Sequence, residues 1–474
     1  MRFNRSRPHR PRHLLAWICS TILALFVGSV LAGFAWRPAI IDNPNWEPPV
    51  GPMEFNGGYR LADFLGNPRA QVMTALAFSG GGKGSAAFAH GVLRGMADIP
   101  VPNTMGEPLS LLDQVEYISS VSGGSFAAAH YAAFRRQSFD TFPDFLHADI
   151  DAEIRKLYLM PWHWIWLMRG GASDDYMAEV YDRLLFHGKT YSDLVKLGAP
   201  VVSVNATDLG TGAVFPFTQE GFDLICASLS PFPIARAVAA SNGLPILFSP
   251  INLPSHRPDC PPVAVPEAPP NATLDEQRRA SYLRSWVARF SDAERVRYLH
   301  LVDGGVADNL ALRTLLNIVL TADLKKLPRT KIASTRRLLL ISVDGESANS
   351  RMLSQEPKVS GLSVLAATVS GIMVDRYNFD TMVLAQSEMA QLVLRLRAAR
   401  CALGPVLNGH PCEDVEGLVV HLDLSLISDP VVRARLLATP LALTLPNEEV
   451  DLLVEWGQRV VRDDPQIKKF LAGL

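Results

Sequence analysis

One serine has the neighbours expected of a catalytic nucleophile. Ser122 lies in residues 120–124 (SVSGG), between an apolar run at 115–119 and a helix-like segment of small residues. A serine on a sharp strand-to-helix turn exposes its hydroxyl, and the usual pattern is Gly-x-Ser-x-Gly. Serine replaces the first glycine of that pattern here. Taken alone, the segment therefore predicts either a nucleophile or a turn that caps a helix.

A glycine-rich loop precedes this serine along the chain. Residues 79–84 (SGGGKG) follow an apolar run at 74–78 and open a predicted helix at 84–97. Glycines there let backbone N–H groups approach negative charge closely. Lys83 is followed by glycine rather than by Ser or Thr, and the spacing of a nucleotide phosphate loop is absent. The remaining use is an oxyanion hole, which stabilises a tetrahedral intermediate.

The third chemical feature is an acid at a predicted strand end. Asp303 opens residues 303–305 (DGG), directly after an apolar run at 298–302. We expect this run to be a parallel strand, and the carboxyl ends of parallel strands are where a doubly wound sheet places its chemistry. Asp-Gly-Gly in isolation is more often just a turn.

The elements that must position these residues alternate between strands and helices, which predicts an α/β sandwich with a mainly parallel sheet. A Pro-rich and then charged stretch at 254–296 interrupts this alternation and is expected to be a surface insertion. The predicted strands are 74–78, 115–119, 201–205, 298–302 and 338–343, and the predicted helices are 84–97, 123–136, 234–240, 308–322, 363–398, 430–437 and 447–462.

Together and in this order, the glycine loop, the serine turn and the Asp-Gly-Gly turn resemble the patatin-like phospholipase family. The resemblance extends to residues 205–212 (NATDLGTG) and 239–245 (AASNGLP), which look like the family's middle motifs. It covers roughly 73–345, and more loosely the helices to about 460. It implies a three-layer α/β/α hydrolase fold with a mainly parallel central sheet. It also implies a lipid acyl hydrolase that needs no metal or other cofactor.

The resemblance implies a role for each site residue. Ser122 would be the nucleophile and Asp303 the base of a Ser–Asp dyad. The backbone N–H groups of the glycine loop would form the oxyanion hole, at Gly80, Gly81 and Gly82.

Lys83 occupies a place where the family often has a basic residue. It could support the glycine loop or bind a phosphate head group. The alternative, a solvated loop lysine, is equally compatible with the sequence.

A Ser-His-Asp triad is the main alternative to the dyad. In α/β-hydrolases the histidine follows the acid along the chain, and only His410 and His421 follow Asp303. Neither lies in a convincing setting. His90 and His130 fall on the helices after the two loops, where a structural histidine is the more usual role. We therefore expect Asp303 to act directly as the base.

The N-terminus predicts a membrane anchor. Five arginines precede residue 13, and residues 14–36 carry no charge over 23 positions, which is about 35 Å of helix and enough to span a bilayer. The arginines would stay on the cytoplasmic side, so the catalytic body would lie on the periplasmic or outer side. A cleaved signal sequence, with the body exported, is the alternative.

The remaining chain divides into four expected segments around the anchor. They are a basic cytoplasmic tail at 1–13, a linker at 37–72, the hydrolase domain at 73–400 and C-terminal elements at 401–474 that contain a strand and helices. Without the five N-terminal arginines, the rest of the chain has a net charge of −7. An acidic body of this kind gives no indication of nucleic-acid binding.

An exported body is compatible with disulfides, and Cys401–Cys412 and Cys226–Cys260 are the pairs that spacing suggests. Four free thiols are the alternative. No metal-binding spacing is present.

Three tryptophans in residues 158–168 suggest either a lipid-facing lid or ordinary core packing. Membrane phospholipids or lysophospholipids are the expected substrates. Acyl transfer to a lipid alcohol and a catalytically silent lipid-binding protein are the two alternatives, and the sequence does not address the oligomeric state.

Overall fold

The architecture is taken from a computed structural model of the 474-residue chain. It describes residues 58–60, 72–101, 109–160, 173–255 and 272–474, together with a few single positions in 20–28 and 263–268. Within the last two ranges it leaves out 199, 246, 291, 293, 322–323, 325–326 and 347–361.

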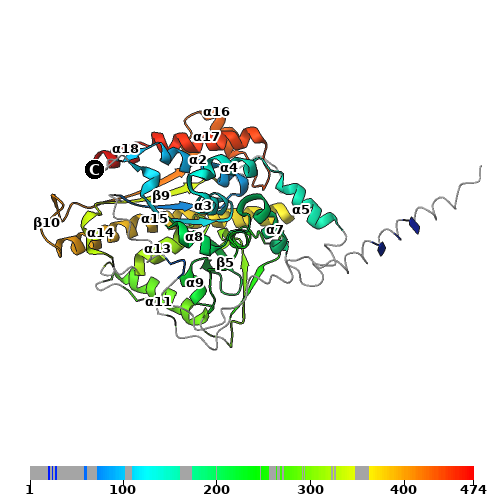
Figure 1. Cartoon of the computed structure of the whole chain (residues 1–474), viewed down its shortest axis with the longest axis horizontal. Coiled ribbons are helices and arrows are strands. Elements are labelled where there is room, and N and C mark those ends of the chain that lie inside the picture. Colours follow the sequence, from blue (N-terminus) through cyan, green and yellow to red (C-terminus); the bar gives the residue numbers. More distant parts are fainter. Residues whose placement is uncertain are drawn as a thin grey trace, which may run out of the picture.

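A single large sheet forms the centre of the fold (Figure 1), and all five predicted strands belong to it. Its strand order is β12-β9-β1-β4-β5-β8-β7, with β6 added beside β5. The five strands from β12 to β5 are mutually parallel, whereas β6, β7 and β8 pair in antiparallel fashion. The bounds are β1 Val72–Phe78, β4 Val115–Val121, β5 Val201–Asp208, β6 Ala213–Pro216, β7 Ile251–Pro254, β8 Tyr298–Val302, β9 Arg337–Asp344 and β12 Glu416–Asp423.

Helices cover both faces of the sheet, which makes three layers (Figure 1). One layer contains α2 (Gly82–Ala97), α3 (Ser122–Phe134), α10 (Ile234–Ser241) and α17 (Asn447–Asp463). The other contains α11 (Leu274–Phe290), α12 (Gly305–Asp308), α13 (Leu312–Thr321), α14 (Arg329–Ser334) and the 40-residue α15 (Leu362–Cys401). Smaller helices complete the body, namely α4 (Ser138–Leu146), α5 (Ile150–Leu159), α7 (Ser173–Tyr181), α8 (Tyr191–Leu197), α9 (Gln219–Asp223), α16 (Pro430–Leu437) and α18 (Pro465–Ala472).

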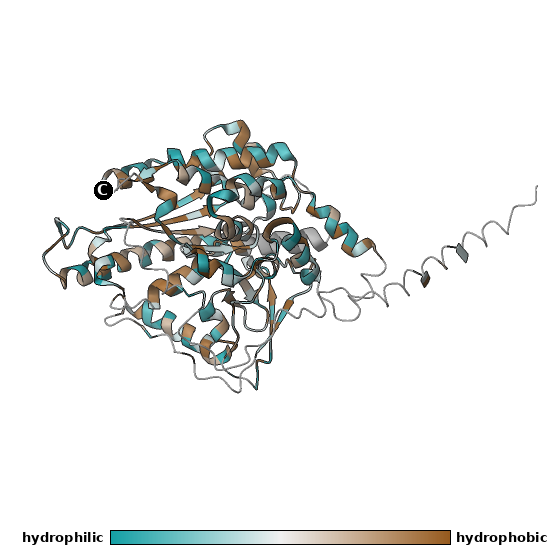
Figure 2. Ribbon diagram, viewed as in Figure 1, coloured by the Kyte–Doolittle hydropathy of each residue, from teal (hydrophilic) through white to brown (hydrophobic). Residues whose placement is uncertain are grey.

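The strands are buried on both faces, as a sheet covered by helices requires. Every residue of β4 and of β5 is buried, and hydrophobic residues gather on the strands and on the helix sides that face them (Figure 2). The one acid in β4, Glu116, is neutralised inside the core by an ion pair with Lys331. The extended core therefore holds the ends of β4 and β5 rigidly.

The register of the strands brings their carboxyl ends to one level. Phe78 of β1 pairs with both Ser120 of β4 and Val343 of β9, and Val121 pairs with Asn205 of β5. The loops that follow β1, β4 and β9 therefore start side by side at one edge of the sheet.

The direction of β8 differs from the prediction. β8 runs antiparallel to β5, with Thr207 opposite Val302 and Asp208 opposite Leu301. Its carboxyl end therefore points back along β5 toward Asn205, which is the level at which β4 ends. Asp303 reaches the site because of this reversal, and the expectation of a parallel strand before it was wrong.

The C-terminal helix α17 packs unusually close to α2. A Cβ atom built on Gly91 would lie 2.2 Å from the carbonyl oxygen of Val454, and one built on Gly457 would lie 2.4 Å from that of Phe88. Only glycine permits this backbone contact. The C-terminal segment is thus part of the layer that covers α2.

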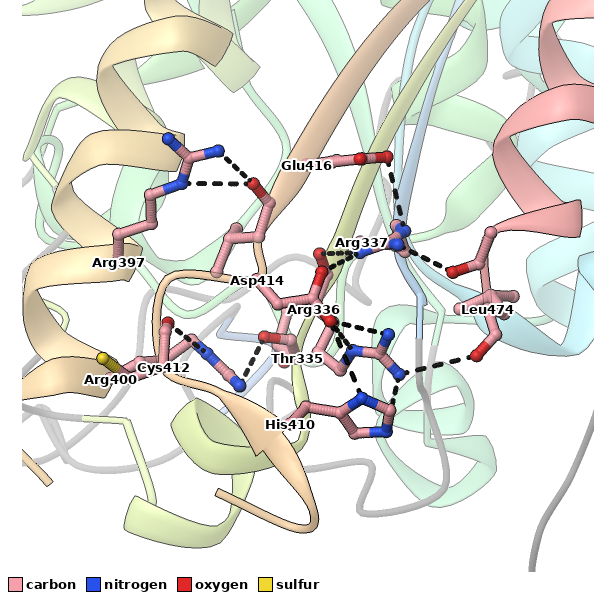
Figure 3. A network of polar contacts seen from close by, with 12 residues as sticks. Thr335, Arg336, Arg337, Arg397, Arg400, His410, Cys412, Asp414, Glu416 and Leu474 are labelled. Carbon is pink, nitrogen blue, oxygen red and sulfur yellow. Dashed lines mark hydrogen bonds and ion pairs between the residues drawn. The ribbon is translucent and has the colours of Figure 1, made fainter. Parts of the chain in front are cut away.

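Arginines organise the opposite edge of the sheet, where β9 and β12 begin (Figure 3). Arg336 and Arg337 form ion pairs with Asp414, and the fully buried Arg400 donates to carbonyl oxygens that include that of Cys412. A Cys401–Cys412 disulfide joins the end of α15 to this loop, as predicted.

Several N-terminal and loop predictions fall on residues that the structure does not describe. Cys226 is disulfide-bonded, but its predicted partner Cys260 is outside the described residues. Nearly all of the predicted anchor at 14–36 and the tryptophan-containing stretch 161–168 are outside them as well. Among the described helices, none combines the length and the apolar composition that a membrane span requires.

Two histidines are buried in the layer that carries α2 and α3. His90 is fully buried against Phe139 and Phe142, and neither of its ring nitrogens has a hydrogen-bond partner among the described residues. His130 also packs on Phe142 and is hydrogen-bonded to Ser138. Burial lowers the pKa of each imidazole to about 3. Both are therefore neutral structural residues, as expected.

These two histidines predict a loss of stability in acid. The unfolded chain takes up a proton at each histidine below about pH 6.5, whereas the folded protein does not until about pH 3. The free energy of unfolding should therefore fall with decreasing pH in this window, by about 1.4 kcal/mol per pH unit for each group. In His90→Leu, the free energy of unfolding, measured with urea, should therefore fall less steeply between pH 6 and 4, because one of the two histidines no longer takes up a proton on unfolding. Phe88→Leu, which alters another fully buried side chain of α2 and removes no titratable group, is the control and should keep the wild-type slope.

Candidate active site

Ser122 sits on a strained turn at the end of β4. Its φ is +47°, a left-handed conformation that is rare for any residue except glycine, and it is the first residue of α3. Its backbone N–H donates to the hydroxyl of Ser241 at 2.9 Å. Ser241 in turn donates to the carbonyl oxygen of Asn205 at 2.6 Å. The turn is thus stabilised from β5 and α10, in the geometry expected of a nucleophile elbow.

The serine that replaces the first glycine of the motif fits without strain. Ser120 is fully buried in β4, and its hydroxyl donates to the carbonyl oxygen of Ser203 at 3.3 Å. It also accepts a hydrogen bond from Ser125 at 3.2 Å. The departure from the usual pattern therefore adds a hydrogen-bond anchor beneath the turn.

The two glycines after Ser122 allow α3 to touch the glycine loop directly. A Cβ atom on Gly123 would lie 2.0 Å from the carbonyl oxygen of Gly82, and one on Gly124 would lie 2.6 Å from that of Ser79. The N–H of Gly124 donates to the same Ser79 oxygen at 3.1 Å. The loop and the nucleophile are thereby held in contact.

Ser122 and Asp303 form the predicted pair. The hydroxyl of Ser122 donates to Asp303 Oδ2 at 2.8 Å, and the N–H of Gly305 donates to Oδ1 at 2.8 Å. Both side chains are nearly buried. Burial raises the pKa of Asp303 to about 6, although the hydrogen bonds from Gly305 and Ser122 oppose this. Asp303 is therefore ionised at neutral pH yet more basic than an ordinary aspartate.

A second carboxyl group lies near the dyad. Asp174, in the first turn of α7, is buried, and its Oδ2 has no hydrogen-bond partner among the described residues. This oxygen lies against Gly243, where a Cβ atom would be only 2.1 Å away, and Gly243 accepts the backbone N–H of Asp303 at 2.9 Å. Burial raises the pKa of Asp174 well above its ordinary value. Its ionised form is therefore disfavoured beside Asp303.

The glycine loop has two anchored N–H groups and two that are available. Gly80 N–H donates to the carbonyl oxygen of Asn309 at 2.9 Å, and Lys83 N–H donates to that of Ala442 at 2.8 Å. Between them, the N–H groups of Gly81 and Gly82 have no partner within the described part of the chain. Both glycines have positive φ, at +128° and +61°. The donor of Gly80 is therefore already used, whereas those of Gly81 and Gly82 remain available for the predicted oxyanion hole.

The family model of patatin-like phospholipases matches residues 76–316, which is about half of the chain. The chain belongs to the patatin-like phospholipase family. The matched stretch contains the glycine loop, Ser122 and Asp303 in the order that the sequence predicted.

Structural likeness to solved proteins is weak. Human GIVD cytosolic phospholipase A2 aligns with a TM-score of 0.41 and 13% identity, over 85% of this chain and 62% of that one. The same enzyme in complex with methyl gamma-linolenyl fluorophosphonate inhibitor and terbium chloride aligns with a TM-score of 0.39 and 12% identity, over 85% and 59%. The patatin-like chain thus spans about three fifths of the length of these structures. Comparison with curated proteins yields no match.

Residues of the two middle motifs of the patatin-like domain form hydrogen bonds with the backbone at or near Ser122 and Asp303. Asn205 donates to the carbonyl oxygen of Ser120 at 3.0 Å, and the hydroxyl of Thr207 donates to that of Asp303 at 2.8 Å. Ser241, described above, holds the N–H of Ser122. Sequence reasoning matched these motifs without assigning their residues a role, since only the fold brings them under the site.

Lys83 points away from the dyad. Its ammonium group donates to the carbonyl oxygens of Phe145 and Ala148 at 2.7 and 3.2 Å, and it lies 4.2 Å from the centre of the Phe145 ring. Burial lowers the pKa of Lys83 to about 7. In this position it ties the glycine loop to the end of α4, which is the loop-supporting one of its two predicted roles.

The histidines considered for a triad lie elsewhere. His410 lies in the arginine network at the opposite edge of the sheet (Figure 3). His421 lies beside Ser342, Asp344 and Asp423 at the ends of β9 and β12. The hydrogen-bond partner of Ser122 is the carboxylate of Asp303.

The raised pKa of Asp303 predicts the pH dependence of hydrolysis. Only the carboxylate can take the proton of Ser122, so kcat/KM should fall as the pH drops through about 6. Asp303→Asn should lower kcat by about 10²–10⁴-fold, which is the usual contribution of a general base. Because folding disfavours the buried charge, this variant should unfold at the same or a higher temperature at pH 7.5.

Asp308→Asn is the matched control. Asp308 is also buried with its pKa raised to about 6, but it accepts a hydrogen bond from the N–H of Arg313 instead of from Ser122. Replacement of Asp308 should leave the fall of kcat/KM near pH 6 unchanged. Near-normal turnover in Asp303→Asn would exclude the dyad.

The anchored glycine loop predicts a second sensitive position. A Cβ atom on Gly82 would lie 2.5 Å from the carbonyl oxygen of Ala442, so Gly82→Ala must displace the loop. We expect kcat to fall at least about tenfold with little change in KM. Gly212 has a similar φ of +68° but open space around it, so Gly212→Ala imposes only backbone strain. Equal losses of activity in the two variants would count against the placement of the oxyanion hole.

Proposed function

We propose that this protein hydrolyses carboxylic ester bonds of membrane phospholipids or lysophospholipids through an acyl-Ser122 intermediate. The observation that carries the proposal is the 2.8 Å hydrogen bond from Ser122 to the buried carboxylate of Asp303. The available N–H groups of Gly81 and Gly82 beside it support the same chemistry. A nucleophile, a base and oxyanion donors are the parts that acyl transfer through serine requires.

The proposed reaction has two balanced halves. Ser122 Oγ attacks the ester carbonyl carbon while its proton passes to Asp303 Oδ2, and the N–H groups of Gly81 and Gly82 stabilise the oxyanion. The intermediate collapses to acyl-Ser122, and the departing lipid alcohol takes the proton from Asp303. Water then attacks the acyl-enzyme, again giving its proton to Asp303. The fatty acid leaves, and Ser122 recovers its hydroxyl proton.

We further propose that residues 14–36 hold the protein at a membrane with the catalytic body on the periplasmic or outer side, or direct its export. The arginine-rich start of the sequence supports this orientation. The Cys401–Cys412 disulfide and the disulfide at Cys226 are compatible with an oxidising compartment. Membrane lipid would then be available to the site without diffusion through water.

Covalent labelling tests the nucleophile directly. A fluorophosphonate probe should label the wild-type protein, and Ser122→Ala should abolish labelling. Mass spectrometry of phospholipid vesicles should detect free fatty acid with the wild type but not with this variant. Ser138→Ala is a control, because Ser138 is also buried but is hydrogen-bonded to His130 and not to any residue that holds Ser122 or Asp303.

Three outcomes separate the alternatives. Labelling with fatty-acid release supports hydrolysis. Labelling with transfer of the acyl chain to an added lipid alcohol, and no free fatty acid, would favour acyl transfer. A folded wild-type protein that neither labels nor turns over lipid would overturn the proposal in favour of a lipid-binding role.

A further inference from the structure

One residue outside the dyad touches both halves of the catalytic machinery. Asn309 follows the short helix α12, six positions after Asp303, and is 7% exposed. Its backbone carbonyl oxygen accepts the N–H of Gly80 at 2.9 Å. Its side-chain Oδ1 lies against two α-carbons, because a Cβ atom would be 2.3 Å away if built on Gly80 and 2.8 Å away if built on Gly305. Asn309 is therefore wedged between the oxyanion loop and the turn that carries the base.

The orientation of the Asn309 amide is set by Glu346. The Nδ2 group of Asn309 donates to Glu346 Oε2 at 2.6 Å, and a carboxylate can only accept this hydrogen bond. The oxygen of the amide must therefore face Gly80 and Gly305. The Cβ position of Gly305 is also 3.1 Å from Asp303 Oδ1, so the amide oxygen and this carboxylate oxygen both lie beside Gly305.

Glu346 is itself held at the end of β9. Its backbone N–H donates to Asp344 Oδ1 at 3.1 Å, and the same oxygen accepts the hydroxyl of Ser79 at 2.8 Å. The Cα of Glu346 would be 3.3 Å from a Cβ atom on Gly81. The carboxylate thus approaches Asn309 from a segment that already packs on the glycine loop.

We propose that Asn309, oriented by Glu346, is a positioning residue that holds the oxyanion loop and the base turn in register and withholds an N–H donor from Asp303. This inference rests on the proposed function of the Ser122–Asp303 pair. An amide turned the other way would direct its NH₂ group toward the side of Asp303, where it would stabilise the carboxylate and weaken the base.

Other titratable groups near the two carboxylates come from three elements. Asp174 and Tyr181 face Asp303 from α7, and burial raises the pKa of each. Asp344 of β9 lies beside Glu346, with His421 and Asp423 of β12 behind it. None of these is altered by the substitutions below, so a change in the acid limb reports on Asn309 and Glu346.

Two substitutions should move the acid limb of kcat/KM in opposite directions. Glu346→Ala frees the amide to rotate and donate toward Asp303, so the limb should move to lower pH by about 0.5–1 unit, and kcat should fall about tenfold. Asn309→Asp places a charge beside Asp303, so the limb should move to higher pH. Glu346→Gln keeps an acceptor for the Asn309 amide and should restore wild-type behaviour.

Loss of the wedge itself is tested with Asn309→Ala. This variant should lower kcat by about 10–100-fold while KM changes little, because displaced catalytic groups affect the transition state more than binding. The double variant Asn309→Ala/Glu346→Ala should be no worse than the single Asn309→Ala, since Glu346 acts through Asn309. Asn317→Ala, on α13, is the control for removal of an asparagine side chain.

The measurements use the full chain, a soluble p-nitrophenyl ester from pH 5 to 9, and thermal unfolding to verify that each variant is folded. Absent hydrolysis by the wild type would refute the proposed function. With an active wild type, limbs that stay fixed or move together in Glu346→Ala and Asn309→Asp would overturn the role of Asn309. Multiplicative effects of the two alanine substitutions would overturn the role of Glu346.

Discussion

The active site depends on a backbone contact that has no room for side chains. The first turn of α3 presses against the glycine loop so closely that neither Gly123 nor Gly124 could carry a Cβ atom without meeting the carbonyl oxygens of Gly82 and Ser79. This contact brings the proposed oxyanion donors beside the proposed nucleophile Ser122, which itself adopts a left-handed backbone conformation. Two hydrogen bonds sustain this strain, one from the N–H of Ser122 to the hydroxyl of Ser241 and one from the N–H of Gly124 to the carbonyl oxygen of Ser79.

Asp303, the proposed base, illustrates how catalysis and stability would oppose each other in this site. Burial makes Asp303 a better proton acceptor, and the same burial disfavours its ionised form in the folded protein. Two N–H or O–H donors limit that cost without removing it. Asp174 is subject to the same effect, because burial also raises its pKa.

Local patterns in the sequence predicted much of this site, whereas its long-range geometry could not be predicted. The apolar runs before Ser79, Ser122 and Asp303 correctly marked β1, β4 and β8, since buried strands require such runs. The direction of β8 was missed, because an antiparallel strand between two neighbours leaves the same local sequence pattern as a parallel one. The commitment of the Gly80 donor to Asn309 was missed as well, since it joins residues 229 positions apart and depends on how α12 folds back. The Cys401–Cys412 pair was predictable because only a short loop separates the two residues.

The hydrogen bond from Lys83 to Ala442 changes what counts as the functional unit. Ala442 lies well beyond the stretch that matches the family model, yet its carbonyl oxygen fixes one end of the oxyanion loop. Behind it, α17 lies on α2 through contacts that only glycines permit. The tail is therefore not a dispensable appendage or an interchangeable module. A hybrid that joined the matched stretch to a relative's C-terminal half would contain every recognisable motif. It would lose the contact with Ala442 that fixes the conformation of the glycine loop.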